Sequence, residues 1–375
     1  MINIQSITLR EIRLALKEVF QISSGSETDR RIFLLQLKDA DGIESWSECV
    51  AGSSPNYLPE TIDVAWLAIK KWVAPRVLGR NFQKPEDVQP TLEKNFRGYN
   101  MAKAAIEMGA WELAAQKRDV SLSRLLGGTR DQVATGISLG IQASPEALVQ
   151  KVRDSLDQGY RKIKIKIKPG QDIDYVQAVR DELGDEAPLM VDANNAYSLN
   201  DLEHLKRLDQ FGLIMIEQPL GCDDVVQHAT LQKQLKTPVC LDESITGLDK
   251  AQAMVTLGSG RIINIKPGRL GGFRTSIAVH NFCQEHDIPV WCGGMLESGV
   301  GRSYNVALAS LPNFVIPGDI SPSARYWEQD IIEPEWTMDE HGMIDVPLER
   351  PGMGVKIDMD LIENLTVRCE QLVSN

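Results

Sequence analysis

The chain has 375 residues, a hydrophobic content of 43% and a formal net charge of −12. The negative charge opposes binding to nucleic acid or to an anionic membrane, and no run of about 18 apolar residues predicts a membrane span. Six cysteines without CxxC spacing, together with a first segment unlike a secretion signal, predict a cytoplasmic protein with reduced thiols. The length exceeds the need of one compact barrel, so we expect a second, smaller unit.

That smaller unit is predicted over residues 1–130, as an α+β arrangement. Strands are expected over residues 4–16 and 32–50, the latter being a pair joined by a turn at residues 39–42. A helix whose apolar residues share one face follows, with Asn100 as its N-cap.

Two polar stretches, residues 21–31 and 51–61, interrupt this unit and are expected to be irregular. They fit plain surface loops on loop statistics alone. If the barrel carries a reactive intermediate that must be kept from water, lids over the active site are the better interpretation.

From residue 131 to 325, short apolar runs recur with amphipathic segments between them. Their chemically capable end residues are 24 to 28 positions apart. Such a repeat is typical of consecutive strand–helix units, and eight parallel strands close into a barrel whose functional face is the carboxyl ends of the strands. The end residues are Ser138, Lys166, Asp192, Glu217, Asp242, Lys266, Gly293 and Asp319.

Local signals support this division. Ser144 and Pro145 are typical of the start of a helix, as an N-cap followed by proline at the first helical position. The periodicity stops after Asp319, and residues 326–375 predict short strands broken by prolines that pack back on the N-terminal unit.

Strict lysine/isoleucine alternation over residues 162–168 predicts a strand with its lysines on one face. An edge strand with solvated lysines fits this stretch taken alone. The repeat downstream favours a barrel strand that ends near Lys166.

Asp192, Glu217 and Asp242 end three neighbouring strands, about 5 Å apart, and are expected to form one cluster. Converging buried carboxylates require a cation or raised pKa values. Oxygen ligands without histidine or cysteine favour Mg²⁺ first and Mn²⁺ second.

Lys166 and Lys266 lie four strands apart in a ring of eight, so they are expected to face each other across a substrate carboxylate. This layout suits removal of a proton α to that carboxylate. Lys166 must be neutral to act as a base, and the charges of Lys164 and of the metal would lower its pKa. The five histidines fall away from strand ends, which leaves the lysines as bases.

Several segments resemble the enolase superfamily, in its muconate-lactonising-enzyme-like subgroup, over essentially the whole chain. The resemblance rests on MAKAAIEMGAWELA, KIKIKPG, VDANNAY, IEQPL, CLDESI, NIKPGRLGG, CGGMLESGVGRSYNVALASLPNF and PGDISPSARYW. The last two segments look most like the family of o-succinylbenzoate synthases and N-succinylamino acid racemases. The resemblance implies a modified TIM barrel of (β/α)7β type with an N-terminal α+β capping domain.

The resemblance also implies roles for individual residues. Asp192, Glu217 and Asp242 match the metal ligands, Lys166 the general base, and Lys164 its partner at the substrate carboxylate. Lys266 matches the lysine that stabilises the enediolate in dehydration and acts as second base in racemisation. Substrate contacts are expected from Ser138, Asn194, Arg269, Gly293, Gly294, Met295 and Asp319.

The implied substrate is a small carboxylate, and the implied assembly is a homo-oligomer. Syn elimination of water to give o-succinylbenzoate, for menaquinone synthesis, is the first hypothesis, and racemisation of N-succinylamino acids is a second activity or the main one. Dipeptide epimerase, muconate cycloisomerase and a non-catalytic carboxylate binder stay open. Arg269 is either a charge that keeps Lys266 deprotonated or a surface arginine after a turn.

Overall fold

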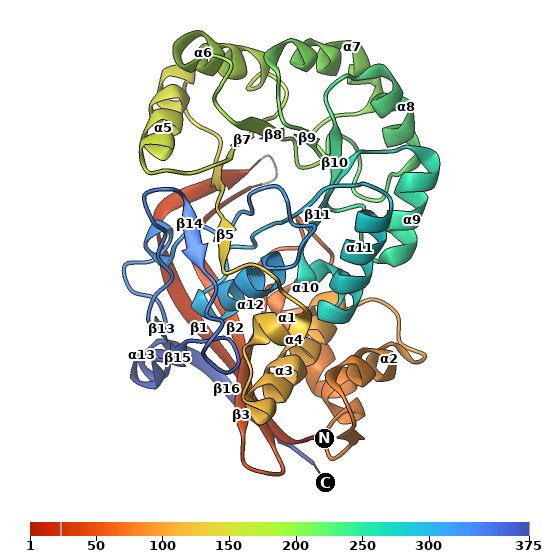
Figure 1. Cartoon of the computed structure of the whole chain (residues 1–375), viewed down its shortest axis with the longest axis vertical. Coiled ribbons are helices and arrows are strands. Elements are labelled where there is room, and N and C mark those ends of the chain that lie inside the picture. Colours follow the sequence, from red (N-terminus) through yellow and green to blue (C-terminus); the bar gives the residue numbers. More distant parts are fainter. Residues whose placement is uncertain (23–24, 375) are drawn as a thin grey trace.

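In the computed structural model, which describes residues 1–22 and 25–374, the first strand organises the cap (Figure 1). Strand β1 (Ile2–Ile22) pairs antiparallel with β2 (Gly25–Asp39) on one side and with the C-terminal β16 (Thr366–Val373) on the other. Strand β3 (Glu44–Cys49) extends the sheet beyond β2, and β4 (Asn81–Phe82) pairs with the start of β1.

The predicted pair of strands over residues 32–50, joined by a turn at residues 39–42, is confirmed by the pairing of β2 with β3. Strand β2 ends at Asp39, whose Oδ1 accepts hydrogen bonds from the backbone of Asp41 (2.9 Å) and Ile43 (3.2 Å). Gly42 in this turn has φ +81°, a conformation that glycine adopts without strain.

The polar stretch 21–31 is not the irregular loop expected from its sequence. Strand pairing continues through it, with Phe20 opposite Glu27 and Gln21 opposite Ser26. Residues 23–24 lie outside the described part. Backbone groups make these pairs and residues 25–29 are mostly exposed, so the sequence shows no apolar alternation here. Residues 51–61, by contrast, form the expected irregular loop.

The cap also contains the helices α1 (Ile62–Ala68), α2 (Val88–Glu93), α3 (Asn100–Arg118) and α4 (Leu122–Leu126), of which α3 packs against β2 and β3. The expected N-cap role of Asn100 is wrong, because helix α3 starts at Asn100 and its N-cap position is Tyr99. The Asn100 side chain instead donates hydrogen bonds to the carbonyls of Arg269 (2.8 Å) and Thr246 (3.3 Å), and so links the cap to the barrel.

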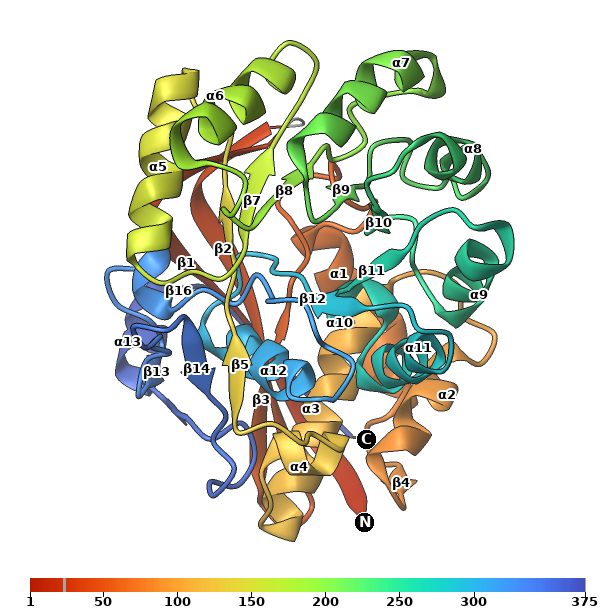
Figure 2. The ribbon, with the colours of Figure 1, turned by 45° about the horizontal axis from the view of Figure 1, so that its top comes forward.

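The parallel barrel sheet comes next along the chain (Figure 2). In the part of the chain that the structure describes, it has seven strands in sequence order, each hydrogen-bonded to the next. They are β6 (Ile137–Leu139), β7 (Ile163–Lys166), β8 (Leu189–Asp192), β9 (Ile216–Glu217), β10 (Val239–Leu241), β11 (Ile262–Ile265) and β12 (Val290–Cys292). The predicted α/β barrel with an N-terminal α+β cap is thereby confirmed.

Helices surround these strands, and Figure 2 shows them as an arc on the outside of the sheet. Helix α5 starts as predicted, because Ser144 is its N-cap and Oγ accepts from the backbone of Ala147 (3.3 Å). The helices are α5 (Pro145–Asp157), α6 (Ile173–Leu183), α7 (Leu202–Leu205), α8 (Val226–Gln234), α9 (Leu248–Leu257), α10 (Pro267–Leu270), α11 (Phe273–Glu285) and α12 (Gly299–Ala309).

The eighth apolar run, residues 313–319, is not a strand. It runs between β12 and the residues just before β6. An isolated β-bridge joins Phe314 to Val290 of β12, and another joins Gly318 to Thr135. Pro317 lacks the N–H that a continuous ladder needs, so the segment closes the ring without forming a regular strand.

The lysine strand is not an edge strand. β7 lies between β6 and β8, and all four of its residues are buried. Ile163 and Ile165 pack in the hydrophobic core, while Lys164 and Lys166 belong to the opposite face.

The C-terminal residues return to the cap and to the link before the barrel. β14 (Met343–Asp345) pairs with β5 (Gln132–Ala134), β15 (Lys356–Ile357) pairs with β13 (Ile332–Glu333), and helix α13 (Met359–Leu365) leads into β16. The division of the chain at residues 130 and 325 stays a prediction. Among the described residues, no helix is long and apolar enough to span a bilayer.

Candidate active site

Adjacent strands bring three of the predicted residues into one row. Lys166 is the register partner of Asp192, and Asp192 is the partner of Glu217. Asp192 is 1% exposed and Glu217 is fully buried. The carboxyl ends of parallel strands meet at one face of a barrel, so these three residues lie at the face where the sequence analysis expects them.

The carboxylates of this row are held by basic and amide groups. Asp192 Oδ2 lies 2.6 Å from Lys166 Nζ and 3.4 Å from Lys164 Nζ. Glu217 accepts from Asn264 Nδ2 (2.6 Å) and from Lys164 Nζ (3.3 Å). Burial and the neighbouring charge of Asp192 raise the pKa of Glu217, which shows how poorly two adjoining carboxylates are solvated here.

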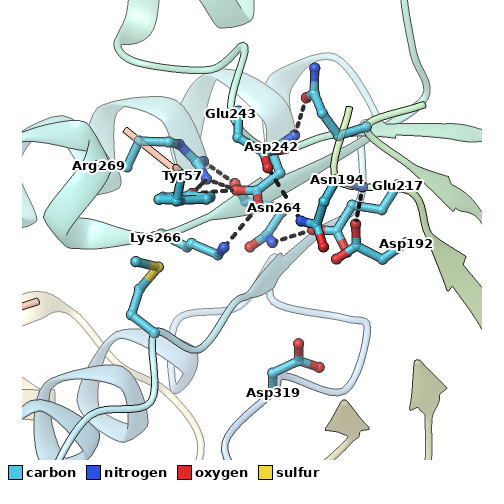
Figure 3. A network of polar contacts seen from close by, with 12 residues as sticks. Tyr57, Asp192, Asn194, Glu217, Asp242, Glu243, Asn264, Lys266, Arg269 and Asp319 are labelled. Atoms are coloured by element: carbon cyan, nitrogen blue, oxygen red, sulfur yellow. Dashed lines mark hydrogen bonds and ion pairs between the residues drawn. The ribbon is translucent and has the colours of Figure 1, made fainter. Parts of the chain in front are cut away.

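Asp242 is turned toward other partners (Figure 3). Its Oδ2 lies 2.8 Å from Lys266 Nζ, and its Oδ1 accepts from the Tyr57 hydroxyl (3.0 Å) and from Arg269. Among residues 1–22 and 25–374, no three Asp, Glu, His or Cys side chains stand together as a ready-made metal site. Each of the three acids is paired with nearby basic or amide groups, and their role as one metal-binding cluster stays a prediction.

The two predicted bases differ in their electrostatic surroundings. Burial is the main cause that lowers the pKa of Lys166, and the charge of Lys164 adds to it. Burial also acts to lower the pKa of Lys266, but the Tyr57 hydroxyl and the carboxylate of Glu217 outweigh it and raise that pKa. In this arrangement the neutral amine is therefore more accessible at Lys166 than at Lys266.

Arg269 is not a surface residue, since it is fully buried. Its guanidinium contacts Asp242, donates to the Tyr57 hydroxyl (3.1 Å), and donates through Nε to the carbonyl of Ile245 (2.7 Å). The pKa of Lys266 is raised overall in this structure, and an opposing, lowering effect of Arg269 stays a prediction.

Lys164 and two predicted substrate contacts lie deeper in the barrel. Lys164 Nζ is 2.6 Å from Asp319 Oδ2, and Lys162 Nζ is 3.1 Å from Asp319 Oδ1. Ser138 is the register partner of Lys164 and is 7% exposed. Asp319 therefore neutralises buried lysines in this structure.

A cavity that opens to solvent lies between barrel and cap, with about 760 Å³ of empty space including its open part. Lys166 and Lys266 both line it, although three strands separate β7 from β11 in the sheet. Asn194, Gly294 and Met295 line it as well. Both polar stretches of the cap contribute to it, through Gly25, Ser26, Glu27, Arg30, Gly52, Ser54, Asn56, Tyr57, Leu58 and Glu60.

Gly293 controls space at the base of this site. A Cβ at this position would lie 2.7 Å from Cε of Lys266 and 2.3 Å from the side-chain oxygen of Asn264. Such distances are well inside van der Waals contact, so any larger residue would displace Lys266.

Sequence reasoning missed several residues that meet at the site. Tyr57 reaches into the barrel from the cap, and Lys266 Nζ lies 4.4 Å from the centre of its ring. Glu243 accepts from the amides of Asn194 (3.3 Å) and Asn195 (3.2 Å). Asn264 was detectable, because it stands two positions before Lys266 on one strand and therefore shares its face.

The donor atoms fit a hard divalent cation. Asp192, Glu217 and Asp242 offer only oxygen, from three neighbouring strand ends. Glu243 Oε2 is buried close by, and no described residue forms a hydrogen bond with it. Oxygen sets of this type suit Mg²⁺ or Mn²⁺ rather than zinc.

Comparisons with known proteins agree with this geometry. A model described as enolase C-terminal domain-like matches residues 147–361, and the N-terminal domain of mandelate racemase / muconate lactonizing enzyme matches residues 4–127. The chain is 44% identical to o-succinylbenzoate synthase of Bacillus subtilis, over 99% of this chain and 98% of the relative. It is 46% identical to N-succinylamino acid racemase of Thermus thermophilus, over 97% and 98%. A crystal structure of an enolase superfamily member from Listeria innocua matches with TM-score 0.96, 39% identity and full coverage of both chains.

Proposed function

Since this chain belongs to the enolase superfamily, we propose that it is an o-succinylbenzoate synthase that also racemises N-succinylamino acids. The main reaction is the dehydration of 2-succinyl-6-hydroxy-2,4-cyclohexadiene-1-carboxylate, a step of menaquinone synthesis. The observation that carries the proposal is the pair of lysines, Lys166 and Lys266, which enter one cavity from strands separated by three others.

The substrate carboxylate would lie between these lysines, beside a divalent cation held by Asp192, Glu217 and Asp242. Mg²⁺ is the proposed ion, with Mn²⁺ as a substitute. When bound, the cation supplies positive charge that stabilises the second negative charge developing on the substrate carboxylate.

Lys166 acts first, as the base. Its lowered pKa favours the neutral amine, which takes the α-proton and becomes an ammonium. The same ammonium then donates that proton to the leaving hydroxyl on the same face. The C–H and C–O bonds break, a ring double bond forms, and water leaves.

Lys266 has a different task in each reaction. In dehydration it stays protonated, as its raised pKa favours, and lends positive charge to the carboxylate from the other face. In racemisation it donates its proton to the α-carbon from that face, after Lys166 has removed the original one. Racemisation is the second candidate for the main activity, because both lysines reach the cavity. Dipeptide epimerase and muconate cycloisomerase are the remaining alternatives.

Exchange of the substrate α-proton with D2O, followed by NMR with Mg²⁺ present, tests the proposal. Lys166→Ala should lose dehydration and racemisation by about 10³-fold or more, because the base is removed. Lys266→Ala should lose racemisation more severely than dehydration. Lys168→Ala, in the same segment but outside the cavity lining, is the matched control and should stay near wild type.

Two results would reject these assignments. Wild-type turnover in Lys166→Ala would rule out Lys166 as the base. Undiminished dehydration and racemisation in Lys266→Ala would contradict the roles given to Lys266. A wild-type protein that binds substrate but exchanges no α-proton would be a carboxylate-binding protein and not this enzyme.

We also propose a cytoplasmic homo-oligomer that acts on small carboxylates. The six cysteines are free in the part of the chain that the structure describes, and reduced thiols are usual in the cytoplasm. Light scattering after gel filtration measures the subunit count, and cell fractionation measures the location.

A further inference from the structure

A buried arginine of the cap lines the same cavity as the two lysines. Arg30, on strand β2, is 3% exposed. Its Nη2 donates to three backbone carbonyls, those of Val50 (3.1 Å), Ala51 (3.2 Å) and Met295 (3.3 Å). This nitrogen thus joins strand β2 to the loop at residues 51–61 and to the barrel segment after β12.

The other nitrogens of this guanidinium are poorly satisfied. Arg30 Nε is buried, and no described residue accepts a hydrogen bond from it. Nη1 lies 3.8 Å from Glu27 Oε2, which exceeds hydrogen-bond length. Glu27 Oε2 is itself buried without a hydrogen-bond partner among the described residues. Arg30 is buried whereas the Glu27 side chain is 31% exposed, so this loose contact gives the buried guanidinium no hydrogen bond that would offset its desolvation.

A planar anion would complete these contacts. A guanidinium carries five N–H donors in a fixed fork, and a carboxylate accepts two of them in parallel. Arg30 from the cap and Lys166 and Lys266 from the barrel line one cavity, so a small molecule with an anionic group at each end meets basic groups at both ends.

We propose that Arg30 binds the remote carboxylate of a dicarboxylic substrate, such as the free end of a succinyl group, while the first carboxylate lies between Lys166 and Lys266. Glu27 gives up its loose contact with Arg30 when the substrate enters. The inference rests on the proposed function and deepens it, because it names the residue that selects substrates with a terminal carboxylate.

The test compares two ligands that differ only at the remote end. N-succinyl-L-phenylalanine ends in a carboxylate, and its succinamyl analogue ends in a neutral carboxamide of the same size. Apolar residues of the cavity, Phe20, Met101 and Leu296, suit the phenyl ring. Calorimetry with Mg²⁺ gives Kd for each ligand, and NMR in D2O gives the rate of α-proton exchange.

Wild type should bind the succinyl ligand about 30-fold more tightly than the succinamyl ligand, as expected for charge-assisted hydrogen bonds. Arg30→Met should reduce this ratio to about threefold or less. Arg30→Lys keeps the charge and should retain an intermediate ratio. Glu27→Gln removes the competing carboxylate and should tighten binding of the succinyl ligand alone, which keeps the test valid if Arg30→Met does not fold.

The inference is overturned if Arg30→Met and Arg30→Lys weaken both ligands equally, because Arg30 then serves only to hold the loops. It is equally overturned if Glu27→Gln leaves the ratio unchanged. Arg30-dependent preference for the succinyl ligand without α-proton exchange would support the inference and reject the proposed function. Exchange of the α-proton without an Arg30-dependent preference for the succinyl ligand would support the proposed function and overturn the inference about Arg30.

Discussion

Glu48 joins the cap to the barrel through a carboxyl group whose ionisation opposes folding. This residue, on strand β3, is 1% exposed and accepts from the backbone of Ser298 (3.1 Å) and Gly301 (3.1 Å) and from the Ser298 hydroxyl (2.6 Å). Burial raises the pKa of Glu48 from 4.5 to about 8. The folded chain therefore keeps Glu48 protonated at pH values where the unfolded chain has lost that proton.

The sign and size of the effect on stability follow from linkage. The contribution is fully present below pH 4.5 and is lost as the pH rises to about 8, because only the folded state binds the proton in this window. The window covers about 3.5 pH units at about 1.4 kcal/mol each, or about 5 kcal/mol. Glu48→Gln should therefore be close to wild type at pH 5 and more stable than wild type, by up to about 5 kcal/mol, at pH 9.

Urea unfolding of wild type and Glu48→Gln, followed by circular dichroism from pH 5 to 9, measures this difference. Glu107 and Glu112, whose pKa values burial raises to about 7, titrate in both proteins and cancel. Glu44→Gln, an exposed change on the same strand, is the control and should give a flat difference. A flat difference for Glu48→Gln as well would refute the reasoning, and would mean that the N-terminus of helix α12 keeps Glu48 ionised.

Three further outcomes are expected. Gly293→Ala should lower turnover by about tenfold or more, because the added Cβ would lie 2.7 Å from Cε of Lys266. The control Gly221→Ala, whose added Cβ has its nearest neighbour at 3.9 Å, should match wild type in steady-state kinetics. Equal turnover of Gly293→Ala and wild type would contradict this prediction. Chelation by EDTA should abolish α-proton exchange and Mg²⁺ should restore it, and exchange that survives dialysis against EDTA would exclude the metal. Tyr57→Phe removes a hydrogen bond to Asp242 that is worth about 1–2 kcal/mol, so kcat/KM should fall about 5- to 30-fold. An unchanged kcat/KM would show that the Tyr57 hydroxyl is dispensable.

The residues at the strand ends could be predicted because the strand–helix units of the barrel repeat at a nearly constant interval in the sequence. Runs that end about 25 residues apart place Lys166, Asp192 and Glu217 on adjacent strands, and the observed register pairs them in that order. The same parity argument would have found Asn264. These inferences need only local pattern and the rule that parallel strands end at one face.

Side-chain partners and cap contacts could not be predicted in this way. Asp242 turns to Lys266, Arg269 and Tyr57, and this choice depends on charges from segments far apart in the chain. Arg30 and Tyr57 reach the cavity from stretches without apolar periodicity, so nothing local marks them. The pairing of residues 20–21 with residues 26–27 was missed because backbone groups make it and residues 25–29 are mostly exposed.

The pairing of β16 with β1 has a consequence for how the chain folds. Residues 6–12 of β1 pair with β16 from the far end of the sequence, and Ser374 N donates to the carbonyl of Gln5 (2.8 Å). Until β16 has docked during folding, residues 6–12 of β1 therefore lack their strand partner on this side. The two ends also lie near each other (Figure 1), so a short linker between them would yield a circular permutant in which β16 precedes β1 and the edge is protected from the start.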